Sequence, residues 1–234
     1  MELKYYEPKA EIVIEPTPAE EYKEVFDDVL ELIAFCARVS NPENQFNNDT
    51  AEKLIRYLIR HKHWSPLEMA SITIGLDSTR DITHQVIRHR SFKFQEFSQR
   101  YANPAELGEM FVLREARLQD TKNRQNSVEL DDEELKSWWE SAQRDVIALA
   151  YEKYEKALAL GIAKECARVI LPEGNTCSRV YMAGDIRSWI HYIELRSANG
   201  TQKEHMELAK TIAKAIAKIF PMVEEFNGET NDNN

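Results

Sequence analysis

Apolar residues recur at spacings of three and four along much of the chain, which is the period of an amphipathic helix. The first such run covers 22–36 and ends at Asn41-Pro42. Asp81 and Asp185 stand where a side chain can cap the helix that follows. Later helices are predicted over about 49–60, 82–89, 135–160, 167–171, 186–193 and 206–220.

Alternation of apolar with polar or small residues predicts the strands. Ile72, Ile74 and Leu76 show this period of two most clearly. Further strands are predicted over 11–15, 92–99 and 177–182. Helices outnumber the strands, which are scattered among them, and no repeat or long linker divides the chain. The pattern therefore predicts one mixed α/β (α+β) domain over residues 1–226.

Two segments lack a clear period. Residues from about 102 to 130 are polar and weakly periodic, and we interpret them as a variable surface excursion. The end of the chain, 227–234, consists of Gly, Glu, Thr, Asn and Asp, which predicts a disordered tail.

The composition, 43% hydrophobic and 30% charged, is ordinary for a globular protein. No apolar run approaches the ~20 residues of a membrane span, and the start lacks the features of a secretory signal. Cys36, Cys166 and Cys177 form no C-x-x-C motif, so the sequence indicates neither a zinc nor a dithiol centre and favours a reducing, cytoplasmic location. The net charge of -10 argues against general binding of nucleic acid.

The stretch 88–101 carries the densest candidate chemistry. It reads Arg-His-Arg-Ser-Phe-Lys-Phe-Gln-Glu-Phe-Ser-Gln-Arg-Tyr and gathers cations within an acidic chain, which indicates an anionic ligand. The alternative is that Arg88, Arg90 and Arg100 form surface ion pairs with Glu96 and Asp81. Guanidinium groups this close repel one another unless an anion lies among them, so a phosphate site is favoured.

Ser98 invites assignment as a nucleophile with His89 as its base. Without a G-x-S-x-G elbow or an identifiable triad, a hydrogen-bonding role toward phosphate or a ring carbonyl is favoured. The roles of two further arginines stay undecided. Arg168 either pairs with Glu165 or points into a cleft. Arg196 either pairs with Glu194 or Tyr192 or also points into a cleft.

A metal site is not predicted. His61, His63 and Glu68 carry suitable donor atoms, but a lone H-x-H pair is weak evidence and H-E-x-x-H is absent. At a helix end, the two imidazoles instead interact favourably with the carbonyl dipole.

The run Arg88-His89-Arg90, followed after seven residues by Ser98 and then Arg100-Tyr101, resembles the signature of the flavin-dependent thymidylate synthases. The resemblance covers most of residues 36–220 and spares the excursion near 102–130. Other blocks resemble the family in its order: Ala37-Arg38-Val39-Ser40, the block 61–68, Ala167-Arg168-Val169-Ile170-Leu171-Pro172, Arg187-Ser188-Trp189 to Leu195-Arg196, and Gln202 with Glu204.

The resemblance implies a central mixed sheet flanked by long helices, and reductive methylation of dUMP to dTMP. It implies FAD as cofactor, methylenetetrahydrofolate as carbon donor and NADPH as reductant. It also implies a homotetramer whose active sites lie between subunits. A hydride delivered by flavin removes the need for a cysteine nucleophile, which matches the absence of an evidently activated cysteine.

The resemblance also implies residue roles. Arg196 would be catalytic, facing the uracil edge and favouring negative charge on the ring. It implies these dUMP ligands: Gln85, Arg88, Glu96, Ser98, Gln99, Arg100, Arg168 and Arg196. It implies these FAD contacts: Ser65, Arg88, His89, Arg90, Ser91, Glu96, Asp185, Arg187 and His191.

Two positions depart from the family pattern. Asp185 stands where the family often has Asn, and His191 stands where some members carry Asn. A competing hypothesis is a non-catalytic dUMP-binding relative that retains the phosphate site. Another is a single-stranded nucleic-acid binder using the Arg and Phe mixture of 88–101, which the acidic charge disfavours.

Overall fold

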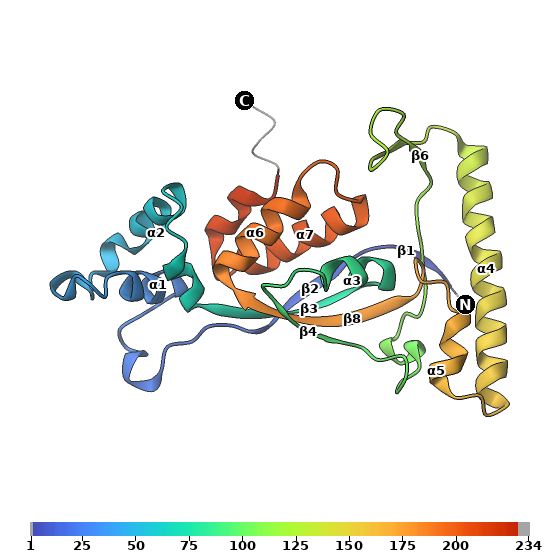
Figure 1. Cartoon of the computed structure of the whole chain (residues 1–234), viewed down its shortest axis with the longest axis horizontal. Helices are drawn as coiled ribbons and strands as arrows, with labels where there is room; N and C mark the ends of the chain where they lie inside the picture. The colour runs from blue at the N-terminus through green and yellow to red at the C-terminus, as the bar shows by residue number, and fades with distance from the viewer. Residues whose placement is uncertain (1, 229–234) are drawn as a thin grey trace.

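The chain folds around a four-stranded antiparallel sheet in the order β2-β3-β8-β4 (Figure 1). The computed structural model describes residues 2–228. The strands of this sheet are β2 (Lys9–Ile14), β3 (Ser71–Thr79), β8 (Cys177–Asp185) and β4 (Lys93–Glu96). Two small sheets pair β1 (Lys4–Tyr5) with β5 (Val112–Leu113), and β6 (Arg117–Gln119) with β7 (Ser127–Glu129).

The mixed α/β class is confirmed, whereas the expected mixed pairing within the central sheet is wrong. β8 runs antiparallel to both of its neighbours, β3 and β4. β3 and β4 therefore point the same way, but β8 lies between them and takes the hydrogen bonds that a parallel pair would have formed. Among the described residues, parallel pairing joins β1 with β5, outside this sheet.

Seven α-helices are described between residues 2 and 228. They are α1 (Val29–Ala37), α2 (Ala51–Arg60), α3 (Arg80–Val86), α4 (Glu133–Ala159), α5 (Lys164–Ala167), α6 (Ile186–Ser197) and α7 (Lys203–Ile216). Short 3-10 turns complete the chain: η1 (Glu20–Tyr22), η2 (Pro42–Asn44), η3 (Asn48–Thr50), η4 (Ser65–Met69), η5 (Pro104–Leu107), η6 (Arg168–Ile170) and η7 (Pro221–Phe226). No helix in the described part is long and apolar enough to cross a membrane.

The main core lies between the sheet and helices α6 and α7, which cover one of its faces (Figure 1). Ile74 of β3 and Met182 of β8 are buried against Trp189 of α6. The Trp189 indole Nε1 donates to the carbonyl of Gly184 at 3.1 Å, so the polar edge of the ring is satisfied inside the core. This packing fixes α6, which carries several of the predicted site residues.

Helix α4 stands apart from the sheet and supports a second core (Figure 1). Its Ile147 and Tyr154 pack with Phe111 and Leu113 from the segment before it. The prediction that 102–130 is a surface excursion is therefore wrong around residues 110–113, which are buried. A four-residue apolar run in a polar segment gives too little period to predict, and distant contacts decide its burial.

Three boundaries also differ from prediction. The helix predicted from residue 22 begins only at Val29, because the side chain of Asp28 caps α1 by accepting from the Glu31 amide at 2.9 Å. Asp81 lies in the first turn of α3 and does not cap it, since the N-cap position is Thr79. The last long helix, α7, ends at Ile216, before the predicted end at residue 220.

The predicted disordered tail is contradicted at its first position, because Asn227 is buried. The rest of that prediction, from residue 229 to 234, lies outside the described residues.

Candidate active site

The carboxylate of Glu96, at the end of β4, is held by three side chains from two other elements. Its Oε1 accepts from Thr83 Oγ1 at 2.9 Å and from Ser178 Oγ at 3.0 Å. Arg80 forms an ion pair with the same oxygen at 3.5 Å. Because Thr83 and Arg80 come from α3 and Ser178 comes from β8, the carboxylate is fixed where the sheet meets α3.

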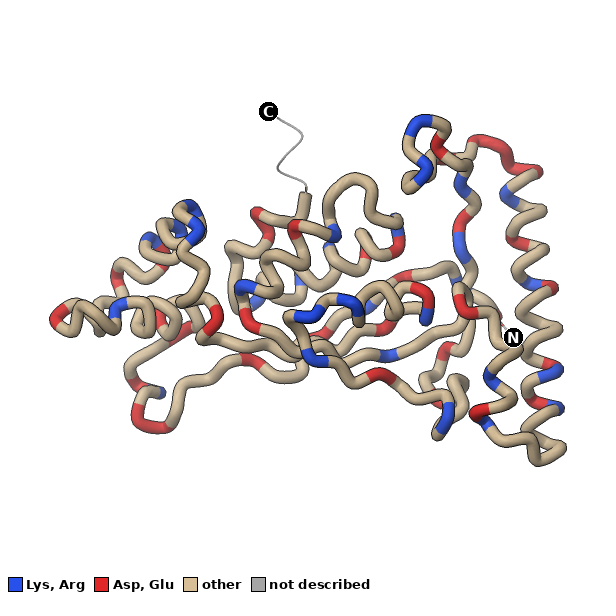
Figure 2. The backbone as a smooth tube through the Cα atoms, in the orientation of Figure 1, with Lys and Arg blue, Asp and Glu red and all other residues tan. Residues whose placement is uncertain are grey.

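Arg88 and Arg90 are exposed in the loop between α3 and β4, where Figure 2 shows basic positions gathered. Neither forms an ion pair with any residue in the described part of the chain. The carboxylates proposed as their alternative partners are engaged elsewhere, since Glu96 pairs with Arg80 and Asp81 with Arg114. Surface ion pairing is therefore absent at these two arginines, and they are available to an anion.

Arg196, near the end of α6, reaches back to the same loop. Its Nε donates to Nε2 of His89 at 2.9 Å, which identifies Nδ1 as the protonated nitrogen of a neutral imidazole. Burial, together with the charge of Arg196, lowers the pKa of His89 to about 4. Arg196 thus does not pair with Glu194 or Tyr192, and His89 cannot serve Ser98 as a base through this nitrogen.

The far end of the 88–101 segment contacts α5. Arg100 Nε lies 3.3 Å from Glu165, and the amine of Lys164 donates to the Tyr101 carbonyl at 3.0 Å. Local pairing of Arg168 with Glu165 is not formed, because Glu165 faces Arg100. Arg168 follows in η6, half-buried and without an ion pair among residues 2–228. The structure thus brings the two predicted phosphate ligands Arg100 and Arg168 to neighbouring elements.

Ser98 and Gln99 form the turn between β4 and this contact. The Ser98 carbonyl accepts from the amides of Tyr101 and Ala102. Gln99 is buried, and its Nε2 has no hydrogen-bond partner in the described structure. A buried unpaired donor costs about 1–3 kcal/mol, so a bound acceptor would relieve a real penalty here.

A separate group of predicted flavin residues lies at the start of α6. Asp185 caps this helix by accepting from the Ser188 amide at 2.7 Å, as predicted. Asn caps as well as Asp does, so the exchange of the family's Asn for Asp185 preserves the helix start. Arg187 forms an ion pair with Glu68 of η4.

His191 lies one turn farther along α6 and contacts Trp64, with ring centroids 4.7 Å apart. Ser65 follows Trp64 and is exposed in η4. The eleven-residue step from Asp185 to Arg196 corresponds to roughly 16 Å along α6, at about 1.5 Å per residue. The predicted site residues Asp185 and Arg196 therefore lie toward opposite ends of this helix.

The residues weighed as metal ligands do not form a metal site. Glu68 pairs with Arg187, while the rings of His61 and His63 lie 6.2 Å apart and His61 packs on Tyr57. The described residues contain no group of three or more His, Cys, Asp or Glu side chains that would hold a metal ion.

Two of the cysteines are poor nucleophiles. Burial raises the pKa of the Cys177 thiol to about 12, and it also raises the pKa of Cys36. Because the thiolate is the nucleophile, neither thiol is activated near neutral pH.

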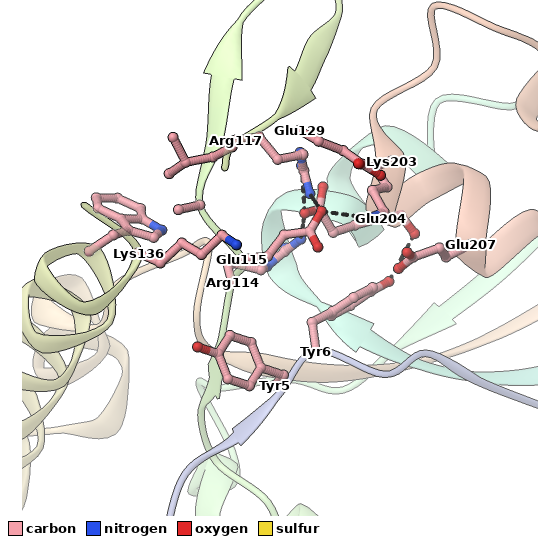
Figure 3. Close-up of a pocket in the computed structure, with 13 residues that line it drawn as sticks. Tyr5, Tyr6, Arg114, Glu115, Arg117, Glu129, Lys136, Lys203, Glu204 and Glu207 are labelled. Atoms are coloured by element: carbon pink, nitrogen blue, oxygen red, sulfur yellow. Dashed lines mark hydrogen bonds and ion pairs between the residues drawn. The ribbon is translucent and has the colours of Figure 1, made fainter. Parts of the chain in front are cut away.

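A cleft of about 470 Å³ lies away from these residues, between α4 and α7 (Figure 3). Glu204 is buried at its base, with Arg114 at 3.3 Å and Arg117 at 2.7 Å, and Arg114 also covers the Tyr6 ring. Glu204 is thus paired with two arginines in this cleft. None of the predicted site residues lines this cleft. Its lining consists of Tyr5, Tyr6, Arg114, Glu115, Ala116, Arg117, Glu129, Leu130, Lys136, Trp139, Lys203, Glu204 and Glu207.

Sequence reasoning missed the residues that support the site from behind. His205 of α7 and Tyr192 of α6 are fully buried beside Gln85, a predicted dUMP ligand. A signal was present, because His205 precedes Leu208 by three positions and so lies on the buried stripe of α7. A polar residue on such a stripe requires a hydrogen-bond partner.

Comparisons with known proteins find a matching family model and similar relatives. The model of the family described as thymidylate synthase complementing protein matches residues 23–222. A probable flavin-dependent thymidylate synthase of Paramecium bursaria Chlorella virus 1 is 54% identical over 193 residues, 82% of this chain and 88% of that protein. A flavin-dependent thymidylate synthase of Synechocystis sp. is 50% identical over 192 residues, 82% of this chain and 86% of that protein.

A solved structure agrees with the fold over nearly the whole chain. The crystal structure of the UMP/dUMP methylase PolB from Streptomyces cacaoi, bound with 5-Br dUMP, superposes with a TM-score of 0.75 at 27% identity. The superposition covers 96% of each chain. The family match over 200 residues and the high identity to its members leave one assignment: the chain belongs to the thymidylate synthase complementing protein family, the flavin-dependent thymidylate synthases.

Proposed function

We propose that this protein converts dUMP to dTMP by reductive methylation. The carbon comes from 5,10-methylenetetrahydrofolate as a methylene group, and two electrons from NADPH, passed through FAD, complete the methyl group and leave tetrahydrofolate. The observation that carries this proposal is the loop of Arg88 and Arg90, which the fold leaves without carboxylate partners while Arg196 reaches the His89 between them. Family membership supplies the reaction to which this anion site belongs.

Different arginines bind the phosphate and the base of the nucleotide. Arg88, Arg100 and Arg168 bind the phosphate, because a guanidinium group matches phosphate oxygens in charge and geometry. Gln99 fits a bound acceptor, since its buried Nε2 is otherwise unpaired. Gln85 of α3, Glu96 of β4 and Ser98 after β4 complete the set of hydrogen-bonding ligands.

Arg196 faces the uracil edge and stabilises negative charge there. Its Nε is engaged by His89, which orients the side chain and leaves the two terminal nitrogens without a partner in the described residues. A guanidinium held in advance at a developing charge lowers the barrier without reorganising during the reaction. The substrate carbon C5 thereby becomes a better nucleophile without a cysteine.

The second group of ligands fits a flavin dinucleotide. Ser65, Asp185, Arg187 and His191 lie at the start of α6 and in η4, while Arg88, His89, Arg90, Ser91 and Glu96 lie in the α3–β4 loop and β4, from which His89 contacts Arg196 near the end of α6. The unpaired cations of the loop suit a diphosphate, and the roughly 16 Å from Asp185 to Arg196 along α6 suits an extended cofactor. When bound, FAD supplies the two-electron reduction that the transferred carbon requires.

The proposal is tested by absorption spectroscopy and product analysis of the purified full-length protein. We expect a flavin spectrum, and dTMP only when dUMP, methylenetetrahydrofolate and NADPH are all supplied. Arg88→Ala should weaken dUMP binding, whereas Arg124→Ala, an exposed arginine of the β6–β7 turn, should not. A protein that binds dUMP but neither binds FAD nor turns over would instead be the non-catalytic relative.

The protein is also expected to assemble as a homotetramer with shared active sites. On α4, Trp139, Val146 and Leu149 lie on one face at spacings of seven and three, and Trp138 adjoins them. Their exposure is high, at 61% for Trp138, 55% for Val146 and 57% for Leu149. A contiguous apolar face of this kind marks an interaction surface, and a second copy of the chain is the occupant that the family implies.

Sedimentation velocity tests this assembly directly. Val146→Glu combined with Leu149→Glu should reduce the assembly state, because each places a charge on the exposed apolar face. Ala148→Glu is the matched control, since residue 148 is exposed on the opposite side of α4. An unchanged sedimentation coefficient in the double variant would exclude this face as the contact.

A further inference from the structure

A chain of buried hydrogen bonds lies directly behind Gln85. His205 of α7 is completely buried, with its Nδ1 3.3 Å from Gln85 Oε1 and its Nε2 3.0 Å from the Tyr192 hydroxyl. The other end of the Gln85 carboxamide donates from Nε2 to Gln202 Oε1 at 2.8 Å. Gln202 in turn donates to Glu204, whose carboxylate is held by Arg117.

The directions of these bonds define the state of the histidine. Gln85 donates from its amide nitrogen to Gln202, so its carbonyl oxygen faces His205. Only a protonated Nδ1 can meet a carbonyl oxygen, and Nε2 is then free to accept from Tyr192. The ring is neutral, because burial and the charge of Arg196 lower the pKa of His205 to about 3.

The charged and titratable groups around His205 agree with this state. From α6, Arg196 opposes a second positive charge, and Tyr192 offers a hydroxyl whose own pKa is raised by burial. From the loop after α3, His89 lies 6.4 Å away, ring to ring, and is neutral as well. On α7 itself, Glu204 is turned toward Arg114 and Arg117.

We propose that His205 is a positioning residue that fixes the orientation of the Gln85 carboxamide, and thereby the donor and acceptor that Gln85 presents to dUMP. The inference rests on the proposed function, because Gln85 is a proposed nucleotide ligand. One lone pair of Oε1 and one proton of Nε2 are used behind the site, and the other lone pair and proton remain for the substrate. A carboxamide that flipped would exchange donor and acceptor toward the nucleotide.

A merely structural role makes a different prediction. If His205 only filled the stripe of α7, a leucine beside Leu208 would serve equally well. Replacing His205 alone would also leave the Tyr192 hydroxyl buried without its partner. The informative variant is therefore His205→Leu combined with Tyr192→Phe, which keeps the packing and removes both polar groups together.

The test is calorimetric dUMP binding to the FAD-loaded protein, with steady-state kinetics of the same preparations. The double variant should raise the Kd and KM for dUMP by roughly 3- to 10-fold, the effect of one lost hydrogen bond, with kcat within about 2-fold and the flavin spectrum retained. His205→Asn should restore dUMP binding to within about 2-fold of the natural protein, because its amide nitrogen replaces the Nδ1 donor.

Unchanged dUMP binding in the double variant, or a loss that His205→Asn does not rescue, would overturn the inference. If the double variant does not fold, the tautomer of His205 in the natural protein carries the test, read from the ¹⁵N chemical shifts of its imidazole. Nδ1 must hold the proton to donate to the Gln85 carbonyl, so a ring protonated at Nε2 alone would overturn the inference. Failure of the natural protein to bind dUMP would instead refute the proposed function.

Discussion

Acid should destabilise this protein through His205 specifically. The imidazole is buried and neutral, and its pKa falls from the ordinary 6.5 to about 3 in the folded state. Since the folded pKa lies below the unfolded one, the unfolded chain binds the proton more readily. The stability linked to His205 is therefore complete above about pH 6.5 and is lost progressively as the pH falls toward the folded pKa.

The size of this loss follows from the unfolded pKa. Between pH 7 and pH 5 the folded ring stays neutral while the unfolded ring becomes charged, which costs about 2 kcal/mol of unfolding free energy. The value depends little on the folded pKa, provided that this lies below about 4. His89, with a pKa lowered to about 4, acts in the same direction. Because His89 is only half-buried, solvent screening reduces its share.

The assay is urea unfolding at pH 7, 6 and 5, at one protein concentration and one FAD concentration. Paired experiments compare the natural protein with His205→Asn, which keeps the Gln85 contact but cannot titrate. The natural protein should lose about 2 kcal/mol more than the variant between pH 7 and pH 5, because other groups titrate equally in both. Equal losses would refute the assignment of a neutral, buried His205, as would a resonance assigned to His205 in the folded protein that titrates near pH 6.5.

Three further outcomes are expected. Arg196→Ala should lower turnover by about 10²- to 10³-fold while the flavin spectrum remains, and equal activity would refute its role in activating the substrate. Gly184→Ala should lower the unfolding free energy by about 1–3 kcal/mol, seen as a lower melting temperature, because the added methyl group meets the Phe92 ring. Gly174→Ala is the control and should leave the melting temperature unchanged, since the nearest neighbour of its added methyl group would lie at 4.0 Å. Phe111→Ala should destabilise by about 3–5 kcal/mol in thermal unfolding if residues 110–113 form a true core, and a change below about 1 kcal/mol would return them to the surface.

Local signals predicted the elements that depend on local interactions. Helix α4 follows from its long apolar period, and α6 from that period together with the Asp185 cap. Prediction failed where a distant contact or a competing cap decided the outcome. Phe111 is buried because Ile147 and Tyr154 of α4 pack on it, and no periodicity of its own segment records that. Helix α1 begins later than predicted because Asp28 caps it, although apolar residues precede that cap at helical spacing.

The candidate site also combines features that local sequence predicts with features that distant contacts decide. Residue type alone predicts an anion site at the loop of Arg88 and Arg90, since the two cations lie close together whatever the fold. The partners that orient it lie far away in sequence and required coordinates. Glu96 accepts a hydrogen bond from Ser178, which lies 82 positions away in the sequence, and Gln85 accepts one from His205, 120 positions away. Hydrogen bonds at such separations leave no spacing rule in a single sequence.

The electrostatics of the site explain how a chain of net charge -10 accommodates a nucleotide monophosphate. The carboxylates nearest the loop are neutralised individually, Glu96 by Arg80 and Asp81 by Arg114. Distant acidic side chains are screened over about 8–10 Å at ordinary ionic strength, so the total charge has little influence there. A nucleotide phosphate at the proposed site would therefore meet the unpaired guanidinium group of Arg88 rather than the average charge of the molecule.

The neutral charge state of His89 and His205 also determines where positive charge lies near Arg196. A charged His89 or His205 would spread positive charge behind Arg196, and each would also lose the hydrogen bond that it now accepts. Burial excludes that state and leaves the positive charge on the guanidinium of Arg196. The charge is then concentrated on the side chain that we propose faces the substrate, where negative charge on the uracil ring must be stabilised.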